Sequence, residues 1–435
     1  MWRSGGDQAR SRRTDRWDTG RVTTSTPTAT DGPFVLPETA TAGVGTRPFG
    51  VYVHVPFCAT RCGYCDFNTY TPGELGTSAS PSSWLEGLRR ELDAAAELTG
   101  APAADTVFVG GGTPSLLGGD GLTDVLAAVR SSFGLAPGAE VTTESNPEST
   151  SPEFFDALLR GGYTRVSLGM QSAAEHVLRV LDRTHTPGRA VAAAREARAA
   201  GFAHVNLDLI YGTPGESESD LDLSLSAVLE ADVDHVSAYS LIVEDGTAMA
   251  RKVRRGDLPA PDDDVLAARY ELVDRRLRAA GFDWYEVSNW ARGEAARCRH
   301  NLGYWDGGDW WGAGPGAHSH VGGVRWWNVK HPARYADVLA EGTLPVAGHE
   351  TLTDDDAHLE RLMLTIRLRT GLPAADLTAA ERRVADDRVD DGLLVLEGGE
   401  SGGDGAGGGE ASGERYVLTD RGRLLADGIV RDIVA

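Results

Sequence analysis

The strongest constraint on the fold is the alternation of short β-branched runs with longer stretches rich in Ala, Leu and Arg, between about residues 48 and 282. Each short run has the length of a strand, and each longer stretch has the length of a helix. Strands separated by helices pair in parallel, and such a sheet is buried on both faces. The predicted strands span residues 50–55, 105–110, 139–145, 164–170, 203–210 and 234–242. The predicted helices span residues 83–98, 119–133, 151–160, 173–181, 187–200, 217–231 and 263–280.

Two architectures would accommodate six such βα units, namely an open doubly wound sheet and a partial barrel. Polar residues recur at the carboxyl ends of nearly all the predicted strands, which is the rim where barrels place their functional side chains. This recurrence favours an incomplete (β/α)6 barrel similar to part of a TIM barrel. The polar residues at the predicted strand ends are Glu144, Gln171, Asp208 and Tyr239.

Three further segments flank the predicted barrel at 48–282. Residues 1–47 contain seven Arg and many Ser and Thr without apolar periodicity, so they are expected to form a disordered tail. Residues 283–350 are expected to be an irregular extension rich in aromatic residues. In residues 351–435 the order helix, helix, strand, loop, strand resembles a small winged-helix domain. Nine of the sixteen residues at 398–413 are Gly, which predicts a flexible insertion in its wing.

The charge of the chain excludes several classes of partner. It has 64 acidic and 42 basic residues, a formal net charge of −22, which repels nucleic acid and anionic lipid. Residues 352–435 carry 18 acidic residues against 10 Arg and no Lys, which argues against DNA binding by a winged helix. No apolar run approaches the 18 or so residues of a transmembrane helix. We therefore expect a cytoplasmic protein with no nucleic-acid partner and no transmembrane segment.

Three of the four cysteines, Cys58, Cys62 and Cys65, fall within eight residues directly after the first predicted strand, and Cys298 lies far away. This distribution is unsuited to a disulfide framework and fits thiols that stay reduced in a cytoplasm. Three thiolates in one loop could hold an iron–sulfur cubane with one iron open to another ligand, or a zinc ion, or could simply be packed. Structural zinc requires a fourth ligand, and the loop is too polar for packing alone, so iron–sulfur is the favoured interpretation.

The CxxxCxxC spacing resembles the signature of the radical S-adenosylmethionine superfamily, and the GGGTP sequence at 110–114 is similar to a second motif of that superfamily. The resemblance implies a 4Fe–4S cluster on Cys58, Cys62 and Cys65, with S-adenosylmethionine on the open iron and an electron donor to the cluster. Arg183, in the sequence LDRTH, is expected at a strand end like the polar residues above. The residues for which the resemblance implies cofactor contacts are Tyr52, Tyr64, Gly111, Gly112, Thr113, Glu144, Gln171, Arg183 and Asp208.

Residues 48–350 resemble one branch of this superfamily, which contains oxygen-independent coproporphyrinogen III oxidase and the heme chaperone HemW. The last segment resembles that branch's own C-terminal domain. The oxidase pattern has a further Cys two positions after the third, whereas this chain has Phe67, and loss of that Cys is typical of the HemW family. The blocks that carry the resemblance lie at 210–217, 239–249, 285–292 and 312–319.

The sequence HNxxYW at 300–305 resembles a motif that the chaperone family associates with heme binding. Seven of the ten Trp and four of the eleven His lie within 284–331, and heme needs aromatic walls and an imidazole or thiolate ligand. For most of these Trp, closing the open barrel as core is the stronger interpretation. His300 is expected in a loop between polar neighbours and is predicted to contact heme, and Cys298 is a weaker candidate.

The leading hypothesis is a chaperone that binds heme and delivers it to a respiratory hemoprotein. The resemblance leaves two alternatives open, both of them enzymes. One is the oxygen-independent coproporphyrinogen III oxidase, and the other is a radical enzyme that uses the Trp-rich segment as a pocket for a different small molecule. No residue is assigned a catalytic role, because the chaperone hypothesis does not require one.

Overall fold

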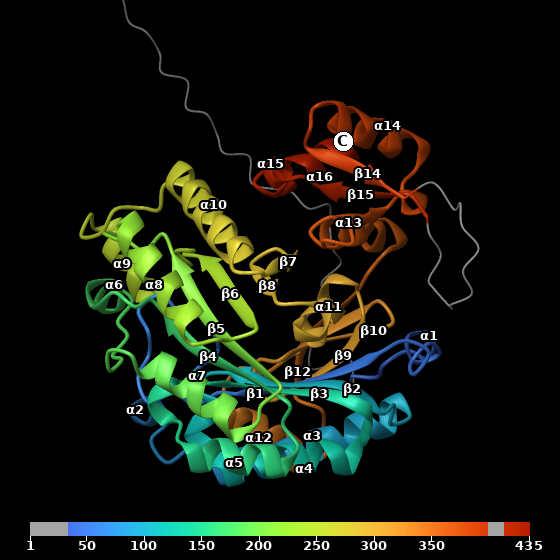
Figure 1. Ribbon diagram of the computed structural model, residues 1–435. Coiled ribbons are helices and arrows are strands. Elements are labelled where there is room, and N and C mark those ends of the chain that lie inside the picture. The colour runs from blue at the N-terminus through green and yellow to red at the C-terminus, as the bar shows by residue number, and fades with distance from the viewer. Residues whose placement is uncertain (1–33, 399–412) are drawn as a thin grey trace, which may run out of the picture.

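The computed structural model describes residues 34–398 and 413–435. Six parallel strands pair in chain order and form the incomplete barrel that the alternation predicted (Figure 1). Each of these strands lies within a few residues of its predicted position, except that β3 begins four residues earlier. The six strands are β1 (Phe49–Val55), β2 (Ala104–Gly111), β3 (Leu135–Ser145), β4 (Arg165–Gln171), β5 (His204–Tyr211) and β6 (His235–Ser240).

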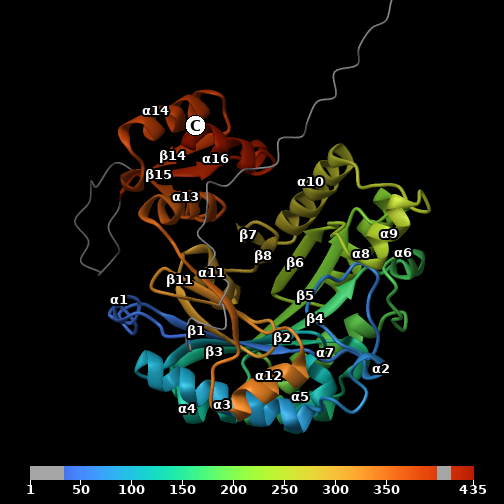
Figure 2. The same cartoon turned by 180° about the vertical axis from the view of Figure 1, so that it is seen from behind.

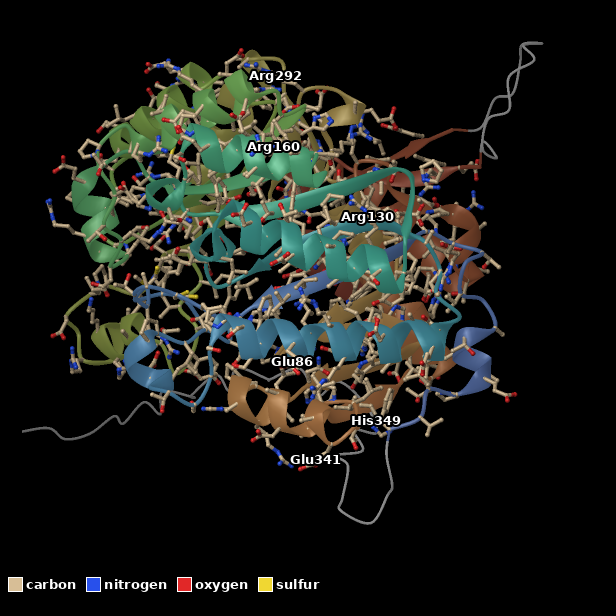
Figure 3. All side chains as sticks on the ribbon, turned by 90° about the horizontal axis from the view of Figure 1, so that it is seen from below. Glu86, Arg130, Arg160, Arg292, Glu341 and His349 are labelled. Carbon is tan, nitrogen blue, oxygen red and sulfur yellow. The ribbon has the colours of Figure 1, made fainter. Side chains whose placement is uncertain are left out.

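Helices cover the outer face of these strands, and the views from opposite sides agree on this layer (Figures 1 and 2). Seen from below, neighbouring helices carry Glu86, Arg130 and Arg160 on this outer layer (Figure 3). Leu88 and Leu92 lie on one helix face and are fully buried, as expected for an amphipathic helix on a sheet. The main outer helices are α3 (Pro81–Thr99), α4 (Gly118–Ser132), α5 (Pro152–Gly161), α7 (Arg189–Ala200), α8 (Glu218–Glu230), α10 (Asp263–Ala279) and α12 (Pro332–Ala340).

Shorter helices lie in the connections between these elements. Among the described residues, no helix has both the length and the apolar composition needed to cross a bilayer. The shorter helices are α2 (Pro72–Leu75), α6 (Glu175–Val180), α9 (Ala248–Arg254) and α11 (Arg299–Trp305).

The expectation that 283–350 is irregular is wrong, because strands from this segment extend the barrel sheet at both ends. β8 pairs antiparallel with β6, and β9 pairs parallel with β1. The sheet is therefore mixed rather than all parallel, with the order β12-β11-β10-β9-β1-β2-β3-β4-β5-β6-β8-β7. Trp290, Trp311 and Trp326 are fully buried, which confirms the core interpretation for these three. The added strands are β7 (Asp283–Glu286), β8 (Asn289–Ala291), β9 (Asp309–Ala313), β10 (His318–Val321), β11 (Val324–Asn328) and β12 (Val346–Thr351).

The predicted disordered tail is too long at its carboxyl end. α1 (Glu38–Thr41) lies within it, and Leu36 and Ala40 are buried. The ring of Phe34 lies 5.3 Å from the ring of Trp326, so this segment packs on the aromatic strands. Residues 1–33 of the predicted tail lie outside the described residues.

The C-terminal segment has a small hydrophobic core of its own, which includes Leu362, Tyr416 and Ile429. Its three strands pair in the order β13-β15-β14. Figures 1 and 2 show the segment beside α10, where the buried Arg423 guanidinium donates to the Asp274 carboxylate at 2.8 Å. Most of the predicted insertion, 399–412, lies outside the described residues, and the winged-helix comparison stays a prediction. The elements are α13 (Asp354–Thr365), β13 (Leu372–Pro373), α14 (Ala379–Asp390), β14 (Leu394–Glu397), β15 (Arg415–Leu418), α15 (Asp420–Arg423) and α16 (Ala426–Val434).

Candidate functional site

The cysteine loop leaves the carboxyl end of β1 at the rim of the barrel. Cys58 donates its backbone N–H to the carbonyl of Tyr70 at 3.0 Å, which closes the base of the loop. Inside the loop, the N–H of Cys65 donates to the carbonyl of Cys62 at 3.4 Å. All three cysteine residues are half-buried and reduced. The loop therefore presents three thiols at the barrel rim from one stretch of chain.

Two polar side chains contact the sulfur atoms of this loop. The Thr113 hydroxyl lies 3.6 Å from Cys58 Sγ, and the Arg183 guanidinium lies 3.6 Å from Cys62 Sγ. Burial raises the pKa of Cys58 and raises that of Cys65 to about 11, so a metal must displace protons to bind there. The Arg183 guanidinium also places a positive charge beside Cys62 Sγ.

The chemistry of the donor set bears on the metals that the sequence left open. Three thiolates leave a structural zinc ion one ligand short of its usual four. A 4Fe–4S cluster can take one cysteine on each of three irons and leave its fourth iron open to another ligand. The three cysteines therefore fit the cluster better than they fit zinc.

The glycine turn after β2 packs directly against the base of the cysteine loop. The N–H of Gly112 donates to the carbonyl of Val55 at 2.8 Å, and that of Thr113 donates to Phe57 at 2.7 Å. A Cβ added at Gly112 would lie 2.5 Å from the Phe57 carbonyl oxygen. Gly111 has φ +107°, a conformation that favours glycine. The structure thus brings the two predicted motifs together through backbone contacts.

Two buried carboxyl groups face the barrel interior next to this turn. Glu144 Oε2 accepts the N–H of Gly111 at 3.0 Å, and burial together with nearby Asp208 raises its pKa to about 7. Burial also raises the pKa of Asp208, which accepts hydrogen bonds from Ser167 and Asn206. Both carboxyls line a cavity of about 210 Å³. A positive ligand group placed there would lower both pKa values.

Three other predicted residues gather around the cysteine loop. Gln171 lies at a register shift between β4 and β5 with φ +65°, a strained conformation that sets the direction of its side chain. The Arg183 guanidinium donates to the carbonyl of Gly169 at 3.2 Å and contacts Cys62. The expected strand-end position of Arg183 is wrong, because this residue follows α6. The chain after α6 folds back so that the Arg183 side chain contacts the cysteine loop. Tyr64 packs on the small apolar cluster beside the loop, and burial raises its pKa.

Tyr52 lies on the inner wall of the barrel. Its hydroxyl shares a hydrogen bond of 2.9 Å with His54 Nδ1, and its ring stacks with Phe108 at 6.3 Å. Burial raises its pKa well above the ordinary value for tyrosine. Tyr52 lines both the interior cavity and a second cavity on its other side, of about 280 Å³.

His300 is not in a loop, because it occupies the first turn of α11. The side chain is buried, and it hydrogen-bonds Thr106 through Nδ1 at 2.8 Å and the Tyr304 hydroxyl through Nε2 at 2.9 Å. Its ring stacks with Phe108 at 5.3 Å, and burial lowers its pKa to about 4. Both ring nitrogens are therefore engaged. Cys298 is also buried, and burial raises its pKa, so its thiol stays protonated at neutral pH.

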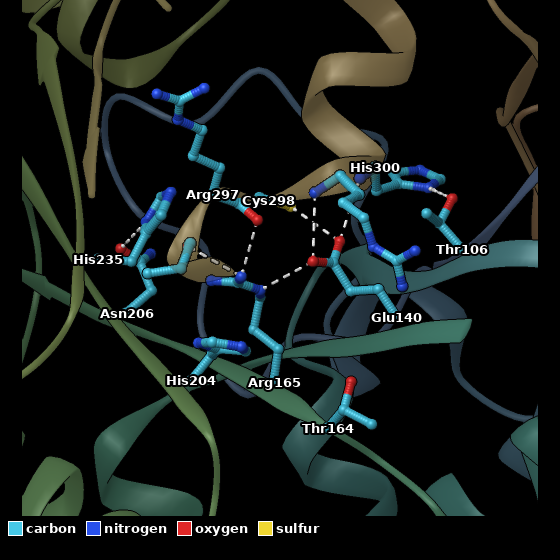
Figure 4. A network of polar contacts seen from close by, with 12 residues as sticks. Thr106, Glu140, Thr164, Arg165, His204, Asn206, His235, Arg297, Cys298 and His300 are labelled. Carbon is cyan, nitrogen blue, oxygen red and sulfur yellow. Dashed lines mark hydrogen bonds and ion pairs between the residues drawn. The ribbon is translucent and has the colours of Figure 1, made fainter. Parts of the chain in front are cut away.

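A buried network that sequence reasoning missed holds α11 against the barrel (Figure 4). Glu140 accepts the backbone N–H groups of Arg299 at 3.2 Å and His300 at 3.1 Å. Arg165 pairs with Glu140 at 3.3 Å and donates to the carbonyl of Ala296 at 2.8 Å. A carboxylate at a helix N-terminus satisfies its free N–H groups and complements the helix dipole. Glu140 and Arg165 therefore determine where His300 lies.

Sequence reasoning also missed most of the polar lining of the barrel interior. The pattern that could have revealed it is period-two alternation, since polar residues at i and i+2 of a strand face the same side. Parallel strands between helices are expected to be buried on two apolar faces, and these polar pairs depart from that expectation. The pairs that line the interior cavity are Thr142 and Glu144, Arg165 and Ser167, Asn206 and Asp208, and His235 and Ser237.

Comparison with known proteins identifies the family. Residues 52–227 match the model of the Radical SAM superfamily. The heme chaperone HemW of Mycobacterium tuberculosis (strain ATCC 25618 / H37Rv) is 63% identical over 388 residues, which are 89% of this chain and 95% of that protein. This chain belongs to the HemW family. The HemW of Bacillus subtilis (strain 168) is 33% identical over 74% of this chain and 84% of that protein.

The fold of this HemW family member is shared beyond the chaperones. A solved structure of the coproporphyrinogen III oxidase HemN of Escherichia coli matches 94% of this chain and 96% of that protein, with a TM-score of 0.76. At 23% identity this match shows the fold alone. Membership of the HemW family within the radical SAM superfamily implies a 4Fe–4S cluster and S-adenosylmethionine as cofactors. The family prediction made from the motifs is confirmed.

Proposed function

We propose that this protein is a heme chaperone, which binds heme and transfers it to an acceptor hemoprotein. The observation that carries the proposal is the 63% identity to a heme chaperone HemW across 95% of that protein's length. Phe67, at the position of the oxidase's additional Cys, supports it. We further propose that the acceptor is a respiratory hemoprotein and that the protein acts in the cytoplasm, where its four cysteines stay reduced.

The residues around the cysteine loop would hold the resident cofactors. Cys58, Cys62 and Cys65 would each bind one iron of the cluster, which supplies an electron to S-adenosylmethionine when an external donor reduces it. Arg183 would offset negative charge at Cys62, which lies 3.6 Å from its guanidinium. The Gly111–Gly112 backbone keeps the space beside this loop free of side chains.

The two buried carboxyls would complete the binding of S-adenosylmethionine. This ligand carries a positive sulfonium and an amino group, and Glu144 and Asp208 offer two carboxyls whose pKa values are raised by burial. Binding of a cation would favour their ionised forms and so release protons. Gln171, whose amide and the Arg183 guanidinium both lie close to Gly169, would add a neutral hydrogen-bonding group.

The test is anaerobic reconstitution of the full chain, followed by heme titration and by transfer of heme to an apo-hemoprotein. We expect a Soret band, transfer of heme, and no production of protoporphyrinogen IX from coproporphyrinogen III. The HemN fold match makes the oxidase the specific rival. Conversion of coproporphyrinogen III by a protein that shows no Soret band would establish the rival and refute the chaperone.

A further inference from the structure

A cavity of about 280 Å³ lies between the end of the cysteine loop and the aromatic strands that extend the barrel. Phe67 and Asn68 line it from the loop side, and Trp310, Ala317 and His318 line it from the strands. Tyr52 and Tyr304 separate this cavity from the barrel interior, because both line the two cavities. The cavity is therefore a distinct space close to the cluster loop but outside the barrel interior.

Large aromatic side chains form walls suited to a flat apolar ligand. Trp310 packs edge-on against Tyr304, with ring centroids 4.7 Å apart. Phe67 is 58% exposed, so its ring contributes little to the core. An exposed aromatic at the mouth of an aromatic cavity is typical of a ligand site rather than of a solvated surface.

One imidazole at this cavity has no competing hydrogen bond. His318 is the first residue of β10, is exposed, and stacks on Trp327 at 5.9 Å with an interplanar angle of 26°. Among residues 34–398 and 413–435, no group hydrogen-bonds its ring nitrogens. Partial burial, together with nearby Lys330 and Arg325, lowers its pKa, so the ring is neutral at pH 7. A neutral imidazole is the form that binds iron.

The other imidazoles within 284–331 each form at least one hydrogen bond through a ring nitrogen. His300 uses both ring nitrogens, with Thr106 and Tyr304. His320 is buried and bonds the carbonyl of Gly308 through Nδ1 at 2.8 Å. His331 accepts the N–H of Ala333 through Nδ1 at 3.2 Å, which caps α12, and it does not line this cavity. His318 is therefore the imidazole of these four that lies at the cavity and is placed to meet an iron.

A positive charge accompanies this imidazole in a chain whose net charge is −22. Lys330 is exposed, and within the described parts of the chain its ammonium forms no ion pair. Its carbonyl accepts a hydrogen bond from Asn68 Nδ2 at 2.8 Å, which joins it to the cavity wall. Arg325 is already paired with Glu350. Lys330 is thus placed to meet an anionic group at the edge of a ligand, such as a heme propionate.

We propose that heme binds in this cavity, with His318 as its iron ligand and Lys330 facing a propionate. The inference rests on the proposed chaperone function and specifies its site. His300 then acts as a positioning residue: it hydrogen-bonds Tyr304, whose ring packs on Trp310 at the cavity wall. This chain of contacts explains how a buried histidine of the HNxxYW sequence influences heme without reaching the iron.

The test is a ferric heme titration of the reconstituted full chain, comparing wild type with His318→Ala. His331→Ala is the matched control, because it removes another exposed histidine from the same segment. We expect the dissociation constant to rise roughly tenfold or more for His318→Ala only, with a shifted Soret band. Added imidazole should restore the wild-type spectrum to His318→Gly, which a purely structural effect would not do. Iron content and circular dichroism verify that each variant is folded and loaded.

The outcomes test the assignment of the iron ligand and the chaperone function separately. Wild-type affinity and spectrum in His318→Ala would overturn the assignment of His318 and leave the chaperone function standing. Absence of heme binding by the wild-type protein would refute the proposed function itself. Lys330→Glu should weaken heme binding without shifting the Soret band, since it changes the edge contact and not the iron ligand.

Discussion

Replacement of Glu140 by Gln should destabilise the protein strongly, because this side chain is buried and accepts hydrogen bonds from four donors. Two donors are the N–H groups of Arg299 and His300, the third is the Cys298 thiol, and the fourth is the Arg165 guanidinium, which is itself 2% exposed. A glutamine amide retains one acceptor oxygen, so it would leave Arg165 unpaired or present an NH₂ group to a helix N-terminus. Breaking a buried ion pair costs about 3–5 kcal/mol, and we expect a loss in this range.

The assay is equilibrium urea unfolding of Glu140→Gln beside Glu86→Gln. Glu86 forms an exposed i, i+4 pair with Arg90, and its loss should cost only about 0.3–0.5 kcal/mol. Hydrogen exchange should also quicken in α11, because Glu140 holds its first turn. Equal stability of the two variants, within about 1 kcal/mol, would refute the reasoning that the Glu140 network positions α11.

Three further predictions follow from other parts of the structure. Cys62→Ser should reduce iron from about four atoms per chain to near zero in an iron assay, with the secondary structure unchanged by circular dichroism. Because burial lowers the pKa of His300 to about 4, the unfolded chain binds a proton at this residue between about pH 6.5 and 4 and the folded chain does not. The free energy of unfolding should therefore fall as the pH is lowered from about 6.5 to 4. Urea midpoints of His300→Gln should lack the part of this decrease that His300 causes. Arg423→Ala removes the buried ion pair between the C-terminal segment and Asp274, which keeps only its contacts with Arg278 and Trp290. Limited proteolysis should then release the C-terminal segment faster than in Arg421→Ala.

The barrel and the position of its cysteine loop were predictable because their signals are local. Strand and helix alternation depends on residues close in the chain, and parallel pairing follows from the helix between each two strands. The Cys58, Cys62 and Cys65 spacing is also local, since a single loop carries all three thiols. The glycine turn at 110–114 could be placed beside that loop because neighbouring parallel strands end at the same rim.

The errors concern residues whose environment depends on distant parts of the chain. The strands between 283 and 350 are three to six residues long and are stabilised by pairing with sheet edges that lie far away in sequence. Ala40 is buried, and it lies against Gly322 in the turn between β10 and β11, which is far away in sequence. His300 looked like a loop residue because the carboxylate that begins its helix, Glu140, lies 160 residues earlier.

The sequence alone determined the family, the barrel and the three-cysteine loop, because each depends on motifs or on patterns among residues close together in the chain. Only the tertiary structure decided which imidazole is free to bind an iron. His300 and His318 lie in the same aromatic segment, and the sequence pattern favoured His300 as the heme contact. Folding buries His300 between Thr106 and Tyr304, and it leaves His318 at an open aromatic cavity. The physical reason is that an iron ligand needs a ring nitrogen without a hydrogen-bond partner, and only folding brings the hydrogen-bond partners of a histidine into contact with it.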